Sequence, residues 1–274
     1  MANLKEIRNR ISSVGSTMQI TSAMKMVSAA KLKRAQDAIT QMRPYASKLK
    51  EILTNLSASL DLSDNAYSEE RDGGQVLIVG ITSNRGLCGG FNNNVIKRVN
   101  ELMQTDYKDQ DVHVLCLGKK IKDVLKRTNH FYTNDYLSAR DDVYADLTFD
   151  NVAEIGEELM HLYKSGEFSK ICVVYNQFVN AATQSVQTEQ FLPVMAPDAG
   201  ESSQSGDYIF EPSKEEIVED LIPKSLKVQL FKAILDSNAA EHGARMTAMH
   251  KATDNASELK KELTLTYNLS LIHI

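Results

Sequence analysis

The first part of the chain carries apolar side chains at a helical spacing. They alternate three and four residues apart, which is the seam of a coiled coil, at Leu4, Ile7, Ile11, Val14 and Met18. The pattern predicts one helix from about Asn3 to Ser57. Such a helix would extend about 80 Å at 1.5 Å per residue, far more than the width of a small domain.

After Met18 the helix changes character in the stretch "ITSAMKMVSAAKLKRAQ". Ala, Ser and Met lie around several faces, and four cations stand among them: Lys25, Lys31, Lys33 and Arg34. One interpretation is a helix with a broad core face. The other is a helix surrounded by partner surface, because small and flexible side chains suit contacts that must be remade.

The last part of the chain predicts a second long helix, from Pro212 to Asn268. "SKEE" supplies a capping box with Ser213 as N-cap. Farther on, apolar residues again step by three or four: Met246, Met249, Ala252, Ala256, Leu259 and Leu263. Two seamed helices at opposite ends of a chain, joined by a compact domain, can pair as an antiparallel coiled coil.

Between the helices, residues 75–194 alternate strand and helix patterns. The predicted strands are 76–82, 112–117, 171–177 and 185–194, with helices beginning near Asn92, at Lys119 and around 152–163. Such alternation indicates a mostly parallel sheet covered by helices. Polar stretches border it, so the expected division is 1–57 (N-terminal helix), 75–195 (α/β domain), 196–211 (linker) and 212–274 (C-terminal helix).

Charge is distributed unevenly along the chain. The first fifty residues carry ten Lys or Arg against Glu6 and Asp37, whereas the whole chain has a formal net charge of −5. A basic arm on an acidic body is expected to meet something acidic. Nucleic acid is one candidate, but the arm has no recognised DNA-binding pattern and Tyr45 is its one aromatic residue, so an acidic protein surface is favoured. The start of the chain has no apolar signal core, which predicts a cytoplasmic protein.

The stretch "VLIVGITSNRGLCGGFNNNVIKRV", residues 76–99, has the strand, glycine-rich turn and helix of a phosphate-binding loop. It lacks the Lys-Ser/Thr pair of a P-loop and the GxGxxG of a dinucleotide fold. A structural turn is therefore favoured over a nucleotide site. The six histidines and three widely spaced cysteines show no ligand spacing, so no catalytic residue, cofactor or metal is expected. His242 and Arg245, one turn apart, form either a partner contact or a surface pair.

Five blocks of the sequence closely resemble the gamma subunit of F-type ATP synthases, from about residue 2 to residue 268. They are "EIRNRISSV" with "ITSAMKMVSAAKLKRAQ", "SNRGLCGGFN", "DYIFEPS" and "AAEHGARMTAMHKATDNA". The resemblance implies a Rossmann-like domain without nucleotide and a pair of terminal helices that turn inside a ring of alpha and beta subunits. It implies a non-catalytic rotor shaft that couples proton flow to ATP synthesis at that ring. The expected location is peripheral, at the cytoplasmic face of a bacterial membrane.

Site residues follow from the same resemblance. Met24 with Lys25, Lys31, Lys33 and Arg34 would face acidic levers of the beta subunits, and Arg245 would lie on the matching side of the C-terminal helix. Tyr208, Phe210 and Glu211 match the foot of the shaft near the c-ring, beside the epsilon subunit. The membrane would be reached only through the complex.

The sequence departs from the family at its end. After "LTLTYN" the family continues its helix for about two dozen residues, whereas here the chain reads "LSLIHI". We expect Leu269–Ile274 to fray unless a partner holds them, because their alternation by two fits no heptad. The ending is either a truncated or mis-joined reading frame, or a shaft without its upper tip.

Two other functions stay open at this stage. An α/β enzyme with coiled-coil oligomerisation arms would need a phosphate-binding or catalytic motif. A basic coiled-coil nucleic-acid binder would need an arm that binds DNA with a steep salt dependence.

Overall fold

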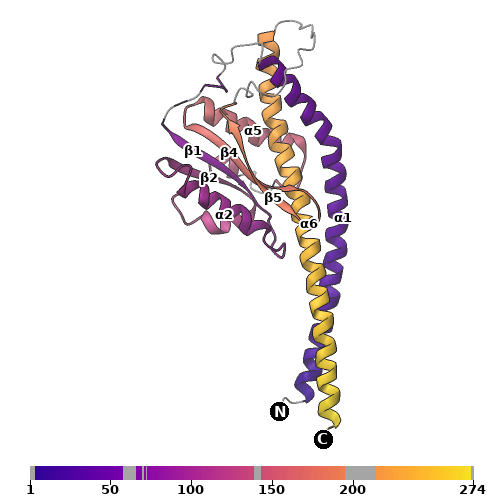
Figure 1. Cartoon of the computed structure of the whole chain (residues 1–274). Coiled ribbons are helices and arrows are strands. Elements are labelled where there is room, and N and C mark those ends of the chain that lie inside the picture. Colours follow the sequence, from indigo (N-terminus) through magenta and orange to yellow (C-terminus); the bar gives the residue numbers. More distant parts are fainter. Residues whose placement is uncertain are drawn as a thin grey trace.

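The structure is a computed structural model that describes residues 4–57, 66–69, 71, 73–138, 143–194 and 214–272. Two long helices run antiparallel along one another, and a sheet with its own helices lies against one side of the pair (Figure 1). Helix α1 spans Leu4–Ser57 and helix α6 spans Lys214–Ile272. Helix α6 lies between α1 and the sheet, and both ends of the chain lie at the end of the pair that extends away from the sheet (Figure 1). The predicted antiparallel helix pair is confirmed.

The sheet has five strands in the order β3-β2-β1-β4-β5. They are β1 (Gln75–Ile81), β2 (Asp111–Leu117), β3 (Phe131–Tyr132), β4 (Phe168–Phe178) and β5 (Gln184–Leu192). All neighbours pair in parallel except β4 and β5, which are antiparallel. The prediction of a mostly parallel sheet is confirmed, and β3 was not foreseen because two residues carry no periodicity.

Helices cover both faces of the sheet. Helices α2 (Phe91–Gln104) and α3 (Lys119–Leu125) pack on one face, and α5 (Phe149–Lys164) packs on the other together with the first part of α6. A short helix, α4 (Asp135–Ser138), precedes α5. Because both faces are buried, the central strands are apolar at nearly every position.

The alternation of side chains along β1 assigns them to the two cores. Leu77, Val79 and Ile81 join the cluster beneath α5 and α6, whereas Val76 and Ile78 join the cluster beneath α2 and α3. Every one of these five side chains is fully buried. The sheet domain therefore has a core of its own, and α6 is part of it.

The seam of α1 continues beyond Met18 without a change of phase. Thr21, Ser28, Leu32, Ala35 and Ile39 are all buried at steps of seven, four, three and four residues. Thr21 and Ser28 make the seam polar at two positions, after which Leu32, Ala35 and Ile39 make it apolar again with the same spacing.

The seam predicted for α6 needs one correction. Leu259 is 45% exposed, so it does not face α1. Thr253 takes the seam position between the buried Met249 and Ala256, and its hydroxyl reaches Thr21 of α1. The prediction of Leu259 was wrong because the seam advances by four residues from Ala256, to the half-buried Lys260, and not by three.

The last described residues are helical, and the expectation that they fray unless a partner holds them stays a prediction. Helix α6 continues through Ile272, although Leu269 and Ile272 are 58% and 75% exposed. Backbone hydrogen bonds propagate from the preceding turns and do not need a seam contact at each residue. Residues 273 and 274 lie outside the described part of the chain, as does Ser213, the predicted N-cap.

Candidate functional site

Three of the predicted contact cations point outward from α1. Lys31, Lys33 and Arg34 are exposed, and Lys33 forms an ion pair with Asp37 one turn along the same helix, at 2.8 Å. With both partners well exposed, this pair contributes little to stability. The three cations form what we call the basic strip of α1.

Met24 and Lys25 are placed differently. Both are half-buried, and the Met24 carbonyl oxygen accepts a hydrogen bond from the buried Ser28 hydroxyl at 2.8 Å. Lys25 Nζ lies 3.4 Å from Nδ1 of His250 on α6. Lys25 therefore belongs to the junction between the two helices as well as to the surface beside the basic strip.

Large apolar side chains are exposed on the same stretch of α1. Ile20, Met26 and Val27 are 60%, 65% and 58% exposed. They do not contribute to a broad core face within this chain. Grouped exposed apolar residues flanked by cations are typical of a protein contact surface.

The glycine-rich loop between β1 and α2 is closed by its own hydrogen bonds. The Ser83 amide donates to Asn92 Oδ1 at 2.9 Å, and the Ser83 hydroxyl donates to the Arg85 carbonyl oxygen at 2.6 Å. Asn92 Nδ2 lies 3.1 Å from the Cys88 sulfur. Leu87 and Gly89 adopt left-handed backbone angles, with φ of 62° and 60°. Glycine tolerates this conformation, whereas at Leu87 it is strained.

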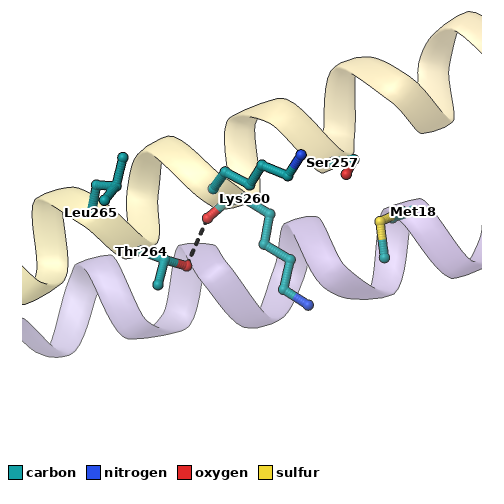
Figure 2. Close-up of a pocket in the computed structure, with 6 residues that line it drawn as sticks. Met18, Ser257, Lys260, Thr264 and Leu265 are labelled. Atoms are coloured by element: carbon teal, nitrogen blue, oxygen red, sulfur yellow. Dashed lines mark hydrogen bonds between the residues drawn. The ribbon is translucent and has the colours of Figure 1, made fainter.

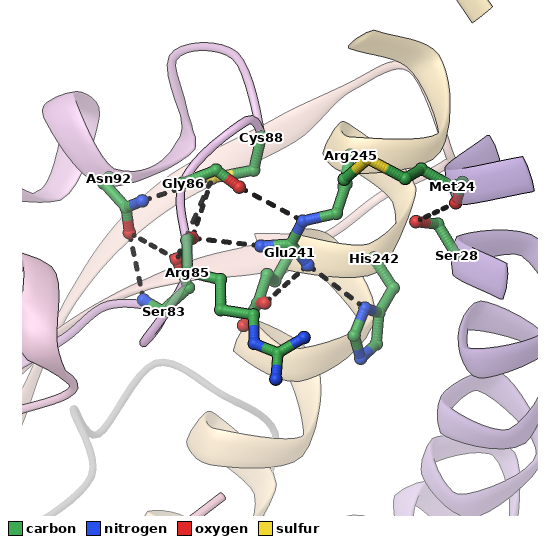
Figure 3. A network of polar contacts seen from close by, with 10 residues as sticks. All are labelled: Met24, Ser28, Ser83, Arg85, Gly86, Cys88, Asn92, Glu241, His242 and Arg245. Atoms are coloured by element: carbon green, nitrogen blue, oxygen red, sulfur yellow. Dashed lines mark hydrogen bonds and ion pairs between the residues drawn. The ribbon is translucent and has the colours of Figure 1, made fainter. Parts of the chain in front are cut away.

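Arg245 of α6 holds this loop from outside (Figure 3). Its Nη2 donates to the Arg85 carbonyl at 3.0 Å and its Nε donates to the Gly86 carbonyl at 3.2 Å. Its Nη1 pairs with Glu241, one turn back on α6, at 2.6 Å. Arg245 is 7% exposed, so the interpretation of a surface pair with His242 was wrong. Its predicted contact with a partner stays a prediction.

Burial changes the acidity of the groups around Arg245. Burial raises the pKa of Glu241, and the nearby Arg245 guanidinium counteracts part of that rise. Burial lowers the pKa of His242 to about 4, with further lowering by the positive charges of Arg245 and Lys31. His242 is therefore neutral at pH 7, and it lies 3.4 Å from Arg245 Nη1 through its Nδ1.

These contacts bear on the nucleotide question. A phosphate-binding loop presents free backbone amides and a cation to the phosphate. Here Asn92 takes the Ser83 amide, and the loop turns the carbonyl oxygens of Arg85 and Gly86 toward Arg245. The geometry is that of a loop docked on a helix.

A shallow groove lies between the helices, nearer the chain ends (Figure 2). It has a volume of about 570 Å³, and its lining residues are Met18, Ser257, Lys260, Lys261, Thr264 and Leu265. Thr264 donates its hydroxyl hydrogen to the Lys260 carbonyl oxygen of its own helix. The groove combines an apolar floor with two lysines.

Other predicted features can be placed briefly. Cys88, Cys116 and Cys172 are buried and form no disulfide with one another. Within the described ranges, no group of His, Cys, Asp or Glu has the arrangement of a metal site. Across the same ranges, no helix is long and apolar enough to cross a bilayer. Tyr208, Phe210 and Glu211 lie outside the described residues.

Sequence reasoning missed the polar contacts that join distant segments. Glu241, Ser83 and Asn92 were not singled out, and neither was the Thr21–Thr253 pair. The one available signal was phase: Thr21 and Thr253 occupy three-four positions of their helices.

Comparison with known proteins agrees with this architecture. A family model described as ATP synthase matches residues 3–270. The ATP synthase gamma chain of Flavobacterium johnsoniae is 61% identical over 270 residues, covering 98% of this chain and 92% of the relative. That of Cytophaga hutchinsonii is 50% identical over 278 residues, covering 98% and 93%. Among solved structures, a rotor chain of the Euglena gracilis mitochondrial ATP synthase matches with a TM-score of 0.67 at 20% identity, covering 98% of both chains.

A long antiparallel helix pair with an α/β domain docked on one helix is thus the fold of an ATP synthase central-stalk chain. The chain belongs to the ATP synthase gamma chain family.

Proposed function

We propose that the chain is the central rotor shaft of an F-type ATP synthase. In this role the helix pair turns inside a ring of alpha and beta subunits and couples proton flow through the membrane sector to ATP synthesis or hydrolysis at the ring. The carrying observation is the exposed surface of α1, where Ile20, Met26 and Val27 stand beside Lys31 and Arg34. A chain with no partner would gain nothing from leaving these side chains in water.

The surface suits a partner that changes during the working cycle. Met26 and the side chains of Lys31 and Arg34 on this surface are flexible, so they can adapt to successive neighbours. Its cations attract acidic side chains at short range, and each exposed pair is worth only about 0.2–1 kcal/mol. Weak contacts of this kind can be broken and remade at each step, as a rotor requires.

The chain itself would perform no chemistry. The docking of the glycine-rich loop on Arg245 supports a structural role for the one segment that resembles a phosphate-binding loop. The nucleotide sites would belong to the alpha and beta subunits. The α/β domain would lie outside the ring, beside epsilon and the c-ring, at the cytoplasmic face of a bacterial membrane.

The test is reconstitution with the alpha and beta subunits of the same source. We expect recovery of a 3:3:1 complex and, in membrane vesicles with the complete enzyme, ATP-driven proton pumping. Replacing Lys25, Lys31, Lys33 and Arg34 together by Glu should weaken assembly or pumping through like-charge repulsion. A variant with Lys31, Lys33 and Arg34 alone replaced separates the basic strip from the Lys25–His250 contact.

The matched control changes the same charge elsewhere. Lys97, Lys108 and Arg127 are exposed on the α/β domain, and their replacement by Glu should leave the complex with alpha and beta intact. If the parent chain is mixed with alpha and beta subunits and is recovered without them, the proposed function is contradicted. Full pumping by the basic-strip variants would show that the cations do not contribute to it.

A further inference from the structure

The position of α1 along the molecule depends on its contact with α6. Helix α6 packs against α5, β4 and β5 as well as against α1, whereas α6 is the one described element with which α1 makes extensive contact. The sheet domain therefore fixes α6 directly and holds α1 mainly through α6.

Apolar seams alone specify such a contact poorly. Residues that repeat every seven positions, such as Leu32 and Ile39, can pack again after one helix slides by a heptad. A slide of that size moves a helix by about 10 Å, since each residue rises 1.5 Å. Polar or charged pairs at single levels of a seam are the usual device that selects one register.

An ion pair links the two helices beside the sheet domain. Arg43 Nη2 of α1 lies 3.5 Å from Oδ1 of Asp236 on α6. The Asp236 side chain is completely buried, and neither of its oxygens has a hydrogen-bond partner among the described residues. Arg43 is the cation that faces Asp236 from the other helix. Lys232 of its own helix also acts on Asp236 and pairs with Glu189 of β5 at 3.7 Å.

A second polar level lies where the pair extends beyond the sheet domain. The hydroxyl of Thr253 donates to the hydroxyl oxygen of Thr21 at 2.8 Å, and Thr21 is buried. One turn away, Lys25 and His250 approach to 3.4 Å. These contacts replace apolar packing in the seam of α1 between Met18 and Leu32.

The two directions of sliding have different effects on these pairs. A slide by one heptad in one direction places Val14 opposite Thr253 and Gln36 opposite Asp236, so Thr253 loses its partner hydroxyl on α1 and the buried carboxylate loses its cation. A slide in the other direction places Ser28 opposite Thr253 and Lys50 opposite Asp236, so equivalent polar pairs can form there.

We propose that the Arg43–Asp236 ion pair and the Thr21–Thr253 hydrogen bond together form a register lock, which opposes sliding of α1 along α6 in the direction that would bring Val14 opposite Thr253. The lock acts in the isolated chain and does not depend on any partner. Its use rests on the proposed function: twisting a pair of supercoiled helices tends to slide one along the other, and a lock at two levels resists that slide in one direction.

Electron-spin distance measurements on the full chain test this proposal. One label replaces exposed Lys33 on α1 and the other replaces exposed Lys108 on the α/β domain. The three native cysteines are buried, so they stay in place. The unlocked variant carries Thr21→Val, Thr253→Val, Arg43→Met and Asp236→Leu, which removes the polar groups and keeps side-chain bulk. We expect one distance in the parent and a second in the unlocked variant, displaced by up to about 10 Å.

Two controls isolate the register. A variant with Thr17→Val, Thr266→Val, Arg10→Met and Glu6→Leu removes the same chemistry from contacts within single helices, and it should keep the parent distance. Labels at exposed Glu258 of α6 and at Lys108 should report no change in the unlocked variant if α1 is the helix that moves.

A folded unlocked variant with the single parent distance would overturn the proposal. If that variant does not fold, Thr21→Val/Thr253→Val and Arg43→Met/Asp236→Asn are measured separately, and a single parent distance in both would overturn it equally. The variant Thr21→Ser/Thr253→Ser retains both hydroxyl groups and should therefore keep the single distance of the parent. These readouts need no alpha or beta subunit, so they are independent of the reconstitution test.

Discussion

Arg245 Nε and the Gly86 carbonyl oxygen lie 3.2 Å apart, although the two residues are 159 positions apart in the chain. The hydrogen bond joins α6 to the loop that follows the first strand of the sheet. With the second bond from Arg245 to the Arg85 carbonyl, it seats the glycine-rich loop at the place where the helix pair leaves the sheet domain. The buried Glu241 carboxylate pairs with the guanidinium of Arg245, so Glu241, Arg245 and the loop form one hydrogen-bonded network.

Arg245→Ala is expected to destabilise the isolated chain by about 3–5 kcal/mol, because it leaves Glu241 buried without its charge partner. The loop carbonyls lose their donors at the same time. Urea denaturation measures the loss, and hydrogen exchange should show faster opening of residues 83–90.

The double variant Arg245→Met/Glu241→Leu separates the cost of an unpaired buried charge from the loss of the two hydrogen bonds to the loop. It should recover most of the stability, since no charge is left buried, but the loop should still exchange faster than in the parent. An Arg245→Ala chain within 0.5 kcal/mol of the parent would show that the pair is not buried in solution.

The lowered pKa of His242 predicts how the stability of the folded chain changes with pH. Its pKa is about 4 in the folded chain, against about 6.5 for an unperturbed histidine. Between these values the unfolded state binds a proton that the folded state does not, so the contribution of His242 to stability falls as the pH falls from 7 to 4. The loss amounts to about 1–3 kcal/mol for a partly screened ring and stops below the folded pKa.

Glu241 and Asp236 act in the opposite direction, because burial raises their pKa values and the folded state takes up their protons first. The measurement is therefore the stability difference between the parent and His242→Gln, followed by denaturation from pH 7.5 to 3.5. This difference should fall toward pH 4 and then level off. A difference that does not vary with pH would contradict the lowered pKa.

Much of the fold could be predicted from the sequence because its elements are long and periodic. The bounds of α1 and β1 and the start of α2 were placed within one residue of those observed, since each carries a strong apolar period or a glycine-rich start. Leu259 was misplaced because steps of three and of four from Ala256 both fit a coiled-coil seam, and the packing against α1 selects the step to Lys260. The role of Arg245 could not be predicted, because it depends on a contact between segments far apart in the chain that only the folded arrangement of α6 and the sheet creates.

Two glycines should respond very differently to alanine. Gly118, between β2 and α3, has a φ of 108°, and a Cβ there would collide with the carbonyl oxygen of Thr82. Gly89 has a φ of 60° with no atom within 4 Å of a Cβ. Gly118→Ala should cost more than about 4 kcal/mol, whereas Gly89→Ala should cost about 1–2 kcal/mol, the strain of a left-handed residue. Thermal unfolding of both variants checks this order, and equal losses would refute the close approach at Gly118.

The exposed apolar residues of α1 predict a separation of stability from assembly. Replacing Ile20, Met26 and Val27 by Ala should leave the isolated chain within about 0.5 kcal/mol of the parent, because these side chains are in water. Binding to alpha and beta subunits should weaken, since each buried apolar side chain contributes about 1–3 kcal/mol.

Ile39→Ala is the matched control for that triple variant. Ile39 is 4% exposed in the seam with α6, so its loss should cost the isolated chain about 2–5 kcal/mol. Unfolding measurements and subunit pull-down on the same preparations give both readouts. Unchanged recovery of the complex with the triple alanine variant would remove these residues from the contact surface.

The last prediction concerns ATP. We expect the isolated chain neither to bind nor to hydrolyse it, because the loop from Gly80 to Gly90 has no lysine to pair with a phosphate and commits the Ser83 amide to Asn92. Titration calorimetry with millimolar ATP and Mg²⁺ should give no binding heat, for the parent and for Gly86→Val alike. The valine variant controls for the loop itself, since added bulk there would block a phosphate that approached the backbone. Micromolar ATP binding by the parent that is lost in Gly86→Val would place a nucleotide at this loop and contradict its purely structural role.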